Sequence, residues 1–151
     1  MASQDNEILL NGVLIQMARS FLQYVSECSL WVSADAASDE AQIIALAARQ
    51  RQDVAEIAAL LDAREFHIDF GSFPTEYTDQ QFLSLCSCMS NLKRSHEMVC
   101  NRIASVVVSL RAAGDSEAAE LLTTIEMHER DILRAMSDIE SDLNKHSAAT
   151  A

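Results

Sequence analysis

Residues 82–110 read FLSLCSCMSNLKRSHEMVCNRIASVVVSL, and this stretch decides the fold class. Apolar side chains recur in it every three or four residues from Phe82 to Leu110, which is the period of one face of an α-helix. Thr78 and Gln81 precede it with the spacing of a capping box, in which each side chain satisfies a backbone N–H of the first turn. The stretch therefore predicts a helix over about 79–111.

Three other segments have the same period, and they predict helices over about 7–32, 39–64 and 116–143. Ser38 is a suitable N-cap for the second of these helices. Gly114 is placed to end the helix over 79–111, and Asp115 is placed to cap the next one. The polar tail, 144–151, is expected to be frayed.

The connections between these helices define the architecture. The first and second helices, and the third and fourth, are joined by only a few residues, so each pair is expected to be an antiparallel hairpin. The middle connection, 65–77, is longer and holds Pro74 and three of the five phenylalanines, Phe66, Phe70 and Phe73. Thirteen extended residues reach roughly 43 Å, enough to cross a bundle of helices about 39 Å long. The sequence predicts one all-α domain over 1–151, a four-helix bundle whose two hairpins are joined by a long extended crossover. The length of this segment permits the second and third helices to be parallel, and an antiparallel arrangement of the two stays open.

Composition excludes several classes of protein. Only three glycines and one proline occur, too few for the turns of a sandwich, barrel or Rossmann-type fold. The net charge of −12 argues against a nucleic-acid partner, and the acidic surface argues against binding to a membrane. No signal peptide is evident, so we expect a cytoplasmic protein whose four cysteines are buried free thiols.

Three polar residues occupy positions where the helical period calls for an apolar side chain. Gln50, His96 and Glu129 each interrupt one apolar stripe, and a turn centred near residue 113 places His96 level with Glu129. Asp53 lies one turn beyond Gln50, and His128 adjoins the stripe of the last helix. Because a buried carboxylate is costly unless it is paired or coordinated, we expect these side chains to form one polar layer inside the bundle.

Four helices, a long middle crossover and polar residues in mid-helix resemble the ferritin-like superfamily. The segments 18–27 (ARSFLQYVSE) and 69–79 (DFGSFPTEYTD) also resemble parts of small bacterial ferritin-like proteins. The resemblance implies a di-metal pattern of Glu, Glu-x-x-His, Glu and Glu-x-x-His along the four helices. In this chain, Met17 or Ser20 stands in the first slot, Gln50-x-x-Asp53 in the second, His96 in the third, and Glu129 with Ile132 in the fourth. One ligand of six is kept in kind, and so the pattern is eroded.

These observations favour a non-enzymatic ferritin-like bundle of unknown role, with Gln50, His96 and Glu129 as a structural polar layer and no catalytic residue. The alternative is a metal-binding protein in which His96, Glu129 and Asp53 hold iron, manganese or zinc at a mononuclear or degenerate di-metal site. A second alternative is an interaction module that acts through a homodimer or through exposed aromatic residues. Trp31 and the phenylalanines of the crossover are the candidates for such a surface.

Overall fold

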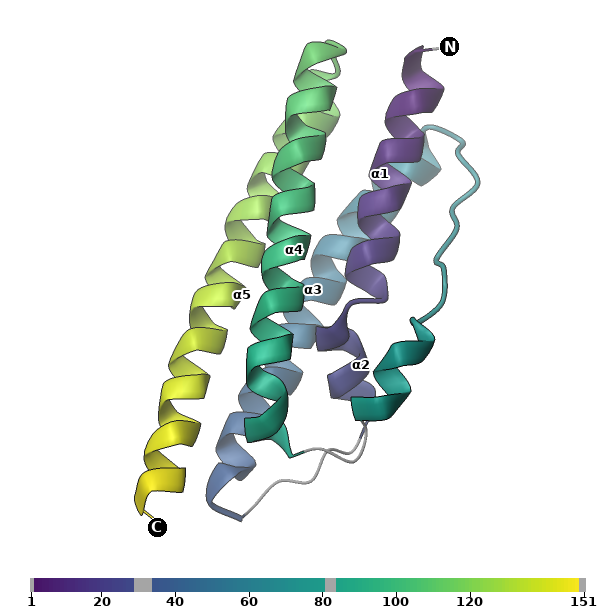
Figure 1. Ribbon diagram of the computed structural model, residues 1–151. Coiled ribbons are helices and arrows are strands. Elements are labelled where there is room, and N and C mark those ends of the chain that lie inside the picture. The colour runs from purple at the N-terminus through teal and green to yellow at the C-terminus, as the bar shows by residue number, and fades with distance from the viewer. Residues whose placement is uncertain (1, 29–33, 81–83, 150–151) are drawn as a thin grey trace.

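The structure is a computed structural model that describes residues 2–28, 34–80 and 84–149. The described residues form helices and loops, with no β-strand. Four long helical segments pack side by side as a bundle (Figure 1). They are α1 (Ala2–Ala18) continued by the short α2 (Phe21–Glu27), α3 (Ala37–Ala63), α4 (Leu85–Ala112) and α5 (Ser116–Ala149). Two 3₁₀ helices, η1 (Ala34–Ala36) and η2 (Thr75–Gln80), precede α3 and α4. The all-α four-helix bundle expected from the sequence is confirmed.

The direction of each helix follows from the ion pairs that join helix ends. Arg64, just beyond α3, bonds to Glu7 near the start of α1 and to Asp115 in the turn between α4 and α5. The ends of α3 and α4 therefore lie together, and these two helices run in the same direction, with the described part of the connection between them, residues 64–80, returning along the bundle (Figure 1).

The connection is held against α1 by polar contacts. The side chain of Asn11 donates to the carbonyl of Asp69 at 3.1 Å and accepts from its N–H at 3.0 Å. The Nε of Arg19 donates to the carbonyls of Phe70 and Gly71. The expected extended segment is present, but it ends at Pro74, because residues 75–80 form η2.

Several helix ends differ from the expected ones, and local hydrogen bonds explain most of the differences. Ser84 caps α4 by accepting from the N–H of Ser87 at 3.2 Å, so this helix begins at Leu85 and not at 79. Thr78 lies inside η2, and its expected partner Gln81 falls outside the described residues, as do Phe82 and Trp31. Ser38 lies inside α3, which begins at Ala37 without a side-chain cap. The tail expected to fray is helical as far as Ala149.

The turn between α4 and α5 is built as expected. Gly114 has a φ of +77°, a left-handed conformation that glycine adopts without steric cost. Asp115 then caps α5 by accepting from the N–H of Ala118 at 3.2 Å. These two residues reverse the chain and set α4 and α5 antiparallel.

One segment, Gln4–Glu27, is long and apolar enough to cross a membrane by length and composition alone. In this structure 56 % of that window is packed inside the bundle, and a core helix of a soluble protein passes the same test. The segment is also interrupted at Arg19–Ser20, where α1 ends and α2 begins.

Candidate functional site

The apolar core is divided into two clusters by a layer of polar side chains. One cluster is formed by α1 with the second half of α3, the second half of α4 and the first half of α5. The other is formed by α2 with the remaining halves of α3, α4 and α5. Between them lie six buried polar residues, each 4 % exposed or less: Ser20, Gln23, Gln50, Asp53, His96 and Glu129. The structure thus brings together all the residues that the sequence proposed for the polar layer.

Ser20 contributes to this layer because the first helix breaks there. Its hydroxyl accepts from the N–H of Gln23 at 3.3 Å, which makes Ser20 the N-cap of α2, and donates to Oε1 of Gln50 at 2.9 Å. The continuous helix expected over 7–32 is therefore wrong, and residues 29–33 fall outside the described part of the chain. Ser20 and Gln23 have capping-box spacing, a signal in the sequence that indicates this second helix start.

Gln23 is a further member of the layer that was not expected from the sequence. Its amide nitrogen donates to Oε1 of Gln50 at 2.9 Å and to the carbonyl of Ala47 at 2.8 Å. Its amide oxygen accepts from Arg51 at 2.9 Å. These bonds join α2 to α3 and leave the amide of Gln50 directed toward α5.

His96 and Glu129 form the centre of the layer. The Nε2 atom of His96 lies 2.9 Å from the carbonyl oxygen of Glu129 and 3.0 Å from its carboxylate Oε2. Gln50 approaches the same Oε2 through its amide nitrogen at 3.5 Å. The two side chains of the pair are 1 % and 0 % exposed, so water does not compete for these bonds.

Asp53 adds a second carboxylate next to Glu129. Its Oδ1 lies 2.9 Å from Nδ1 of His128, a residue that is 32 % exposed and connects the layer to the surface. Burial raises the pKa of Glu129, the bond from His96 opposes that shift, and the negative charge of Asp53 adds to it. The layer therefore contains two acids in which the charge of one disfavours the ionisation of the other.

With both acids ionised, three buried atoms of this layer have no hydrogen-bond partner: Oδ2 of Asp53, Oε1 of Glu129 and Nδ1 of His96. A proton on Glu129 would join the two carboxyl groups by a hydrogen bond, which is one of the causes that raise the pKa of Glu129. Such orphaned atoms are where a metal ion would bind, and the ferritin-like resemblance implies one. The donor set does not fit a di-metal centre, because Ser20 and Gln50 occupy two carboxylate slots and the fully buried Ile132 occupies a histidine slot. Among the described residues no three Asp, Glu, His or Cys side chains surround a common point.

The cysteines do not supply an alternative chemistry. All four are free, as expected, but only Cys88 and Cys100 are buried, whereas Cys28 is partly exposed and Cys86 is exposed. Cys100 lies one turn from His96, yet burial raises its pKa to about 11. Because the thiolate is the nucleophilic form, this thiol is not activated.

A second polar cluster, at the other end of the bundle, has a structural role. The guanidinium of Arg64 bonds to both carboxylate oxygens of Asp115 at 2.7 and 2.9 Å and to Glu7 at 3.2 Å. The pKa of Asp115 is lowered, chiefly by these bonds from Arg64. No pattern in the sequence indicates this clamp, because Arg64 lies 57 residues from Glu7 and 51 residues from Asp115, with no shared motif.

Comparison with protein-family models, with curated proteins and with solved structures found no match to this chain.

Proposed function

We propose that this chain is a non-enzymatic helical bundle of ferritin-like architecture whose polar layer is structural. One observation carries the proposal: the polar groups of the layer bond mainly to one another, in an unbroken series from Ser20 through Gln50 and Glu129 to His96. A series of this kind fixes the heights of four helices relative to each other, since sliding any one helix by a turn would leave buried polar groups unpaired. Parallel α3 and α4, joined by a long connection, support the ferritin-like architecture.

The centre of the layer is buried. Gln50, Asp53, His96 and Glu129 are each 2 % exposed or less, and none of the four lines the three hollows described on the surface, whereas Ser20 and Gln23, at the edge of the layer, line one hollow each. Catalysis requires that a substrate approach the reacting groups, so the burial of these four side chains supports a structural role. We propose that the protein acts in the cytoplasm through its surface, by association with itself or with another molecule.

Mononuclear metal binding is the second candidate function, and it is favoured by the orphaned oxygens of Asp53 and Glu129. Both atoms are buried without a partner in the same layer, where a cation would neutralise two carboxylates. His96 is the remaining candidate ligand, through Nδ1, and its use would require the ring to move, because Nε2 is the atom that faces Glu129.

Elemental analysis separates the two candidates. The purified protein is measured before and after anaerobic loading with Fe(II), Mn(II) and Zn(II) and desalting. The structural proposal expects no stoichiometric metal in the wild type. Metal near one equivalent that is lost in Glu129→Ala and Asp53→Ala, and retained in the matched control Glu126→Ala, would overturn it in favour of a metal protein.

A further inference from the structure

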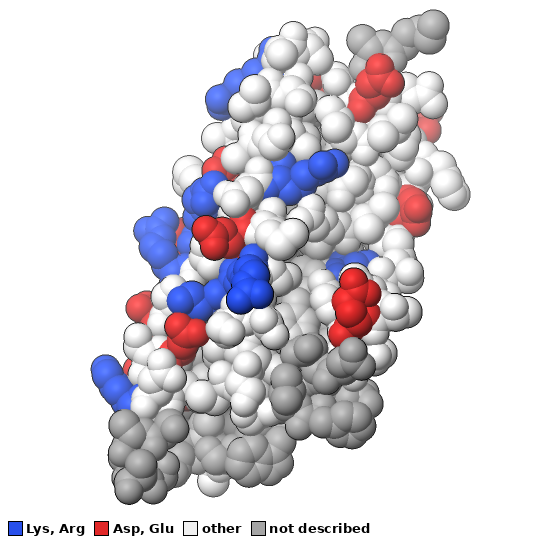
Figure 2. Space-filling model, in the orientation of Figure 1, with Lys and Arg blue, Asp and Glu red and all other residues white. Residues whose placement is uncertain are grey.

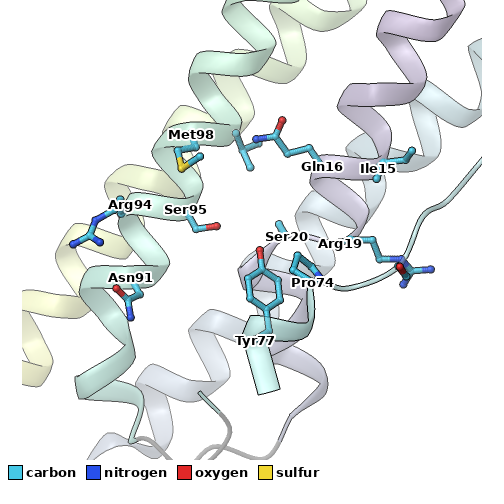
Figure 3. A pocket seen from close by; sticks show the side chains of 12 residues that line it. Ile15, Gln16, Arg19, Ser20, Pro74, Tyr77, Asn91, Arg94, Ser95 and Met98 are labelled. Carbon is cyan, nitrogen blue, oxygen red and sulfur yellow. The ribbon is translucent and has the colours of Figure 1, made fainter. Parts of the chain in front are cut away.

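The connection between α3 and α4 passes over the break between α1 and α2. Arg19 lies at this break, and its Nε donates to the carbonyls of Phe70 and Gly71 at 3.1 and 3.2 Å. Figure 3 shows the Arg19 side chain reaching from α1 to the connection. The span 69–72, which we call the seal, therefore lies over the point where the first helix is interrupted.

The seal is held to the helices by few contacts. Its four described hydrogen bonds to them involve two side chains of α1: Arg19 makes two, and Asn11 makes two with the backbone of Asp69. All four residues of the seal are exposed. A segment with exposed backbone bonds and few packed side chains opens at a lower free energy than the bundle as a whole.

Charge does not hold the seal closed. Residues 65–78 carry three acids, Glu65, Asp69 and Glu76, and no lysine or arginine. In the part of the chain that the structure describes, no ion pair joins these residues to the helices. In Figure 2 acidic side chains are spread along the side of the molecule where the connection runs, and most of the basic ones gather over α4 and α5. Because the whole chain has a charge of −12, repulsion favours opening.

Apolar side chains fix the chain on either side of the seal. Phe66 and Ile68 pack against the core cluster that contains α1. Phe73 and Tyr77 pack against Tyr24 of α2, with ring centroids 5.5 and 5.4 Å from its ring. The seal is thus a short exposed span between two apolar anchors, and its opening does not require the rest of the connection to be released.

A hollow lies on each side of the seal, and each hollow reaches the polar layer. The hollow drawn in Figure 3, of about 370 Å³, is lined by Ser72 and by Ser20. The other, of about 450 Å³, is lined by Phe70 and by Gln23. Arg19 lines both, so Arg19 and the seal separate the two hollows. With the seal closed, Ser20 and Gln23 are only 4 % and 2 % exposed.

From this arrangement we infer that the seal opens and closes over the helix break and controls the access of water and small solutes to the edge of the polar layer formed by Ser20 and Gln23. Release of the seal by Asn11 and Arg19 joins the two hollows into one groove with the break at its floor. Such a groove is large enough to hold water molecules. Both edge residues bond to Gln50, so water that reaches them competes for bonds of the layer. This inference concerns solvent access and holds whether the layer is structural or binds a metal.

Hydrogen exchange followed by NMR tests the inference in the full chain. The side-chain amide of Gln23 is buried and hydrogen-bonded, so its exchange reports the access of water to the layer. Asn11→Ala removes two of the four bonds of the seal without altering Gln23, and it is expected to accelerate exchange of that amide about tenfold. Arg19→Gln removes the other two bonds, and it is expected to accelerate exchange of the Asp69 N–H, which is bonded to Asn11, by a similar factor.

Two control variants match these substitutions. Asn101→Ala removes an exposed asparagine of α4 that makes no hydrogen bond among the described residues, and Arg134→Gln removes an arginine of α5 whose side chain is 76 % exposed. Both are expected to leave the exchange of the two reporter groups unchanged. The N–H of Ala118, in the turn between α4 and α5, is an internal reference that should not respond to the seal.

A disulfide provides a lock for the seal. A Cβ at position 71 lies 3.6 Å from Cβ of Ile15, within the range that a disulfide requires. The lock is Ile15→Cys/Gly71→Cys, with Cys28→Ser and Cys86→Ser to remove the thiols that are not buried. Exchange of the Gln23 side-chain amide is expected to be at least about tenfold slower in the oxidised form than in the reduced form. Because both forms have the same substitutions, the comparison isolates the effect of closure.

Two results would overturn the inference. One is exchange of the Gln23 side-chain amide at the same rate in wild type, in Asn11→Ala and in both redox forms of the locked variant, with circular dichroism showing that each is folded. The other concerns urea: exchange of the wild-type Asp69 N–H that rises with urea as steeply as that of the most protected core amides would mean that the seal opens only when the bundle unfolds.

Discussion

His96 and Glu129 are joined twice: one nitrogen of the imidazole, Nε2, lies within 3.0 Å of both the carbonyl and the carboxylate oxygen of the same residue. A carbonyl oxygen only accepts, so Nε2 must carry the proton, and this fixes the tautomer of a neutral ring. The opposite nitrogen, Nδ1, is buried without a partner and is left as an acceptor. The ring therefore donates a hydrogen bond to Glu129, which partly offsets the cost of burying its oxygens. Removal of His96 and removal of Glu129 are then expected to change the stability of the bundle by different amounts.

Removing His96 is expected to cost more than removing Glu129. In His96→Leu the buried carboxylate and carbonyl of Glu129 lose the N–H of His96, which leaves the carboxylate with the long bond from Gln50, and a broken buried pair costs about 3–5 kcal/mol. In Glu129→Leu the carboxylate that is costly to bury disappears and His96 keeps the backbone carbonyl, so the free energy of unfolding should stay equal or rise. Urea unfolding followed by circular dichroism measures both. Similar, near-zero changes in the two variants would contradict the pairing.

The stability of the bundle is expected to fall as pH rises through the raised pKa of Glu129. The group has an ordinary value of 4.5 in the unfolded chain and a higher one in the bundle, so the folded state binds more protons between these two values. By linkage the free energy of unfolding then decreases with pH in that window, and the favourable contribution is complete only below pH 4.5. Asp115 has the opposite effect, because its pKa is lowered from 3.8 in the folded bundle. Its stabilising contribution is present above pH 3.8 and is lost as the pH falls through the lowered pKa.

The residue responsible for this pH dependence is tested with Glu129→Gln. The amide keeps the shape of the side chain and cannot ionise, so the decrease in stability above pH 4.5 should be reduced. Asp53 on α3 and His96 on α4 face the same carboxylate and are left in place. Urea midpoints from pH 4 to 8 provide the measurement. Parallel curves for wild type and variant would assign the pH dependence to other groups.

Ser20→Ala is expected to be more damaging than Ser84→Ala, although both serines are N-caps. Loss of a cap costs about 1 kcal/mol in each case. Ser20 also donates to the buried Oε1 of Gln50, whereas the Ser84 hydroxyl lies in an exposed position beside Ser87. The loss of unfolding free energy should be about 1 kcal/mol larger in Ser20→Ala than in Ser84→Ala. This difference measures the hydrogen bond from Ser20 to Gln50. Equal losses would mean that this bond contributes no net stability.

Arg64→Ala is expected to destabilise the bundle by about 2–3 kcal/mol, less than a fully buried pair because the side chain is 19 % exposed. It leaves Glu7, which is almost fully buried, and Asp115 without their cation. Arg130→Ala is the control, since its pair with Glu126 is a more exposed i,i+4 pair worth up to about 0.5 kcal/mol. Thermal unfolding compares the two, and a loss in Arg64→Ala no greater than in the control would show that the clamp is dispensable.

Periodicity and turn chemistry were enough to predict a bundle of four long helical segments, but not the break at Ser20 or the relative direction of α3 and α4. The stripes of α3, α4 and α5 identified the core faces, and Gly114 with Asp115 identified the turn between α4 and α5, because these signals are local. The polar layer was predictable for the same reason: Gln50, His96 and Glu129 interrupt regular apolar stripes.

The rest depended on contacts between distant residues. Ser20 and Gln23 have capping-box spacing, but the apolar stripe of the first helix continues on both sides of them. The stripe therefore favoured one continuous helix, and the break at Ser20 was not predicted. Asp53 was placed one turn from Gln50, but its pairing with His128 depends on the rotation of α5 about its own axis. The Arg64 clamp and the contacts of Asn11 with the connection involve side chains brought together only when the bundle is complete.

The long connection between α3 and α4 also determines the order in which the chain can fold. The α4–α5 hairpin closes across a turn at Gly114, at little entropic cost, and so we expect it to form early. The bonds of Arg64 to Glu7 and Asp115 close loops of 57 and 51 residues, and they can form only after α3 has docked. Substitutions in the turn should then slow refolding, whereas loss of the Arg64 clamp should mainly accelerate unfolding.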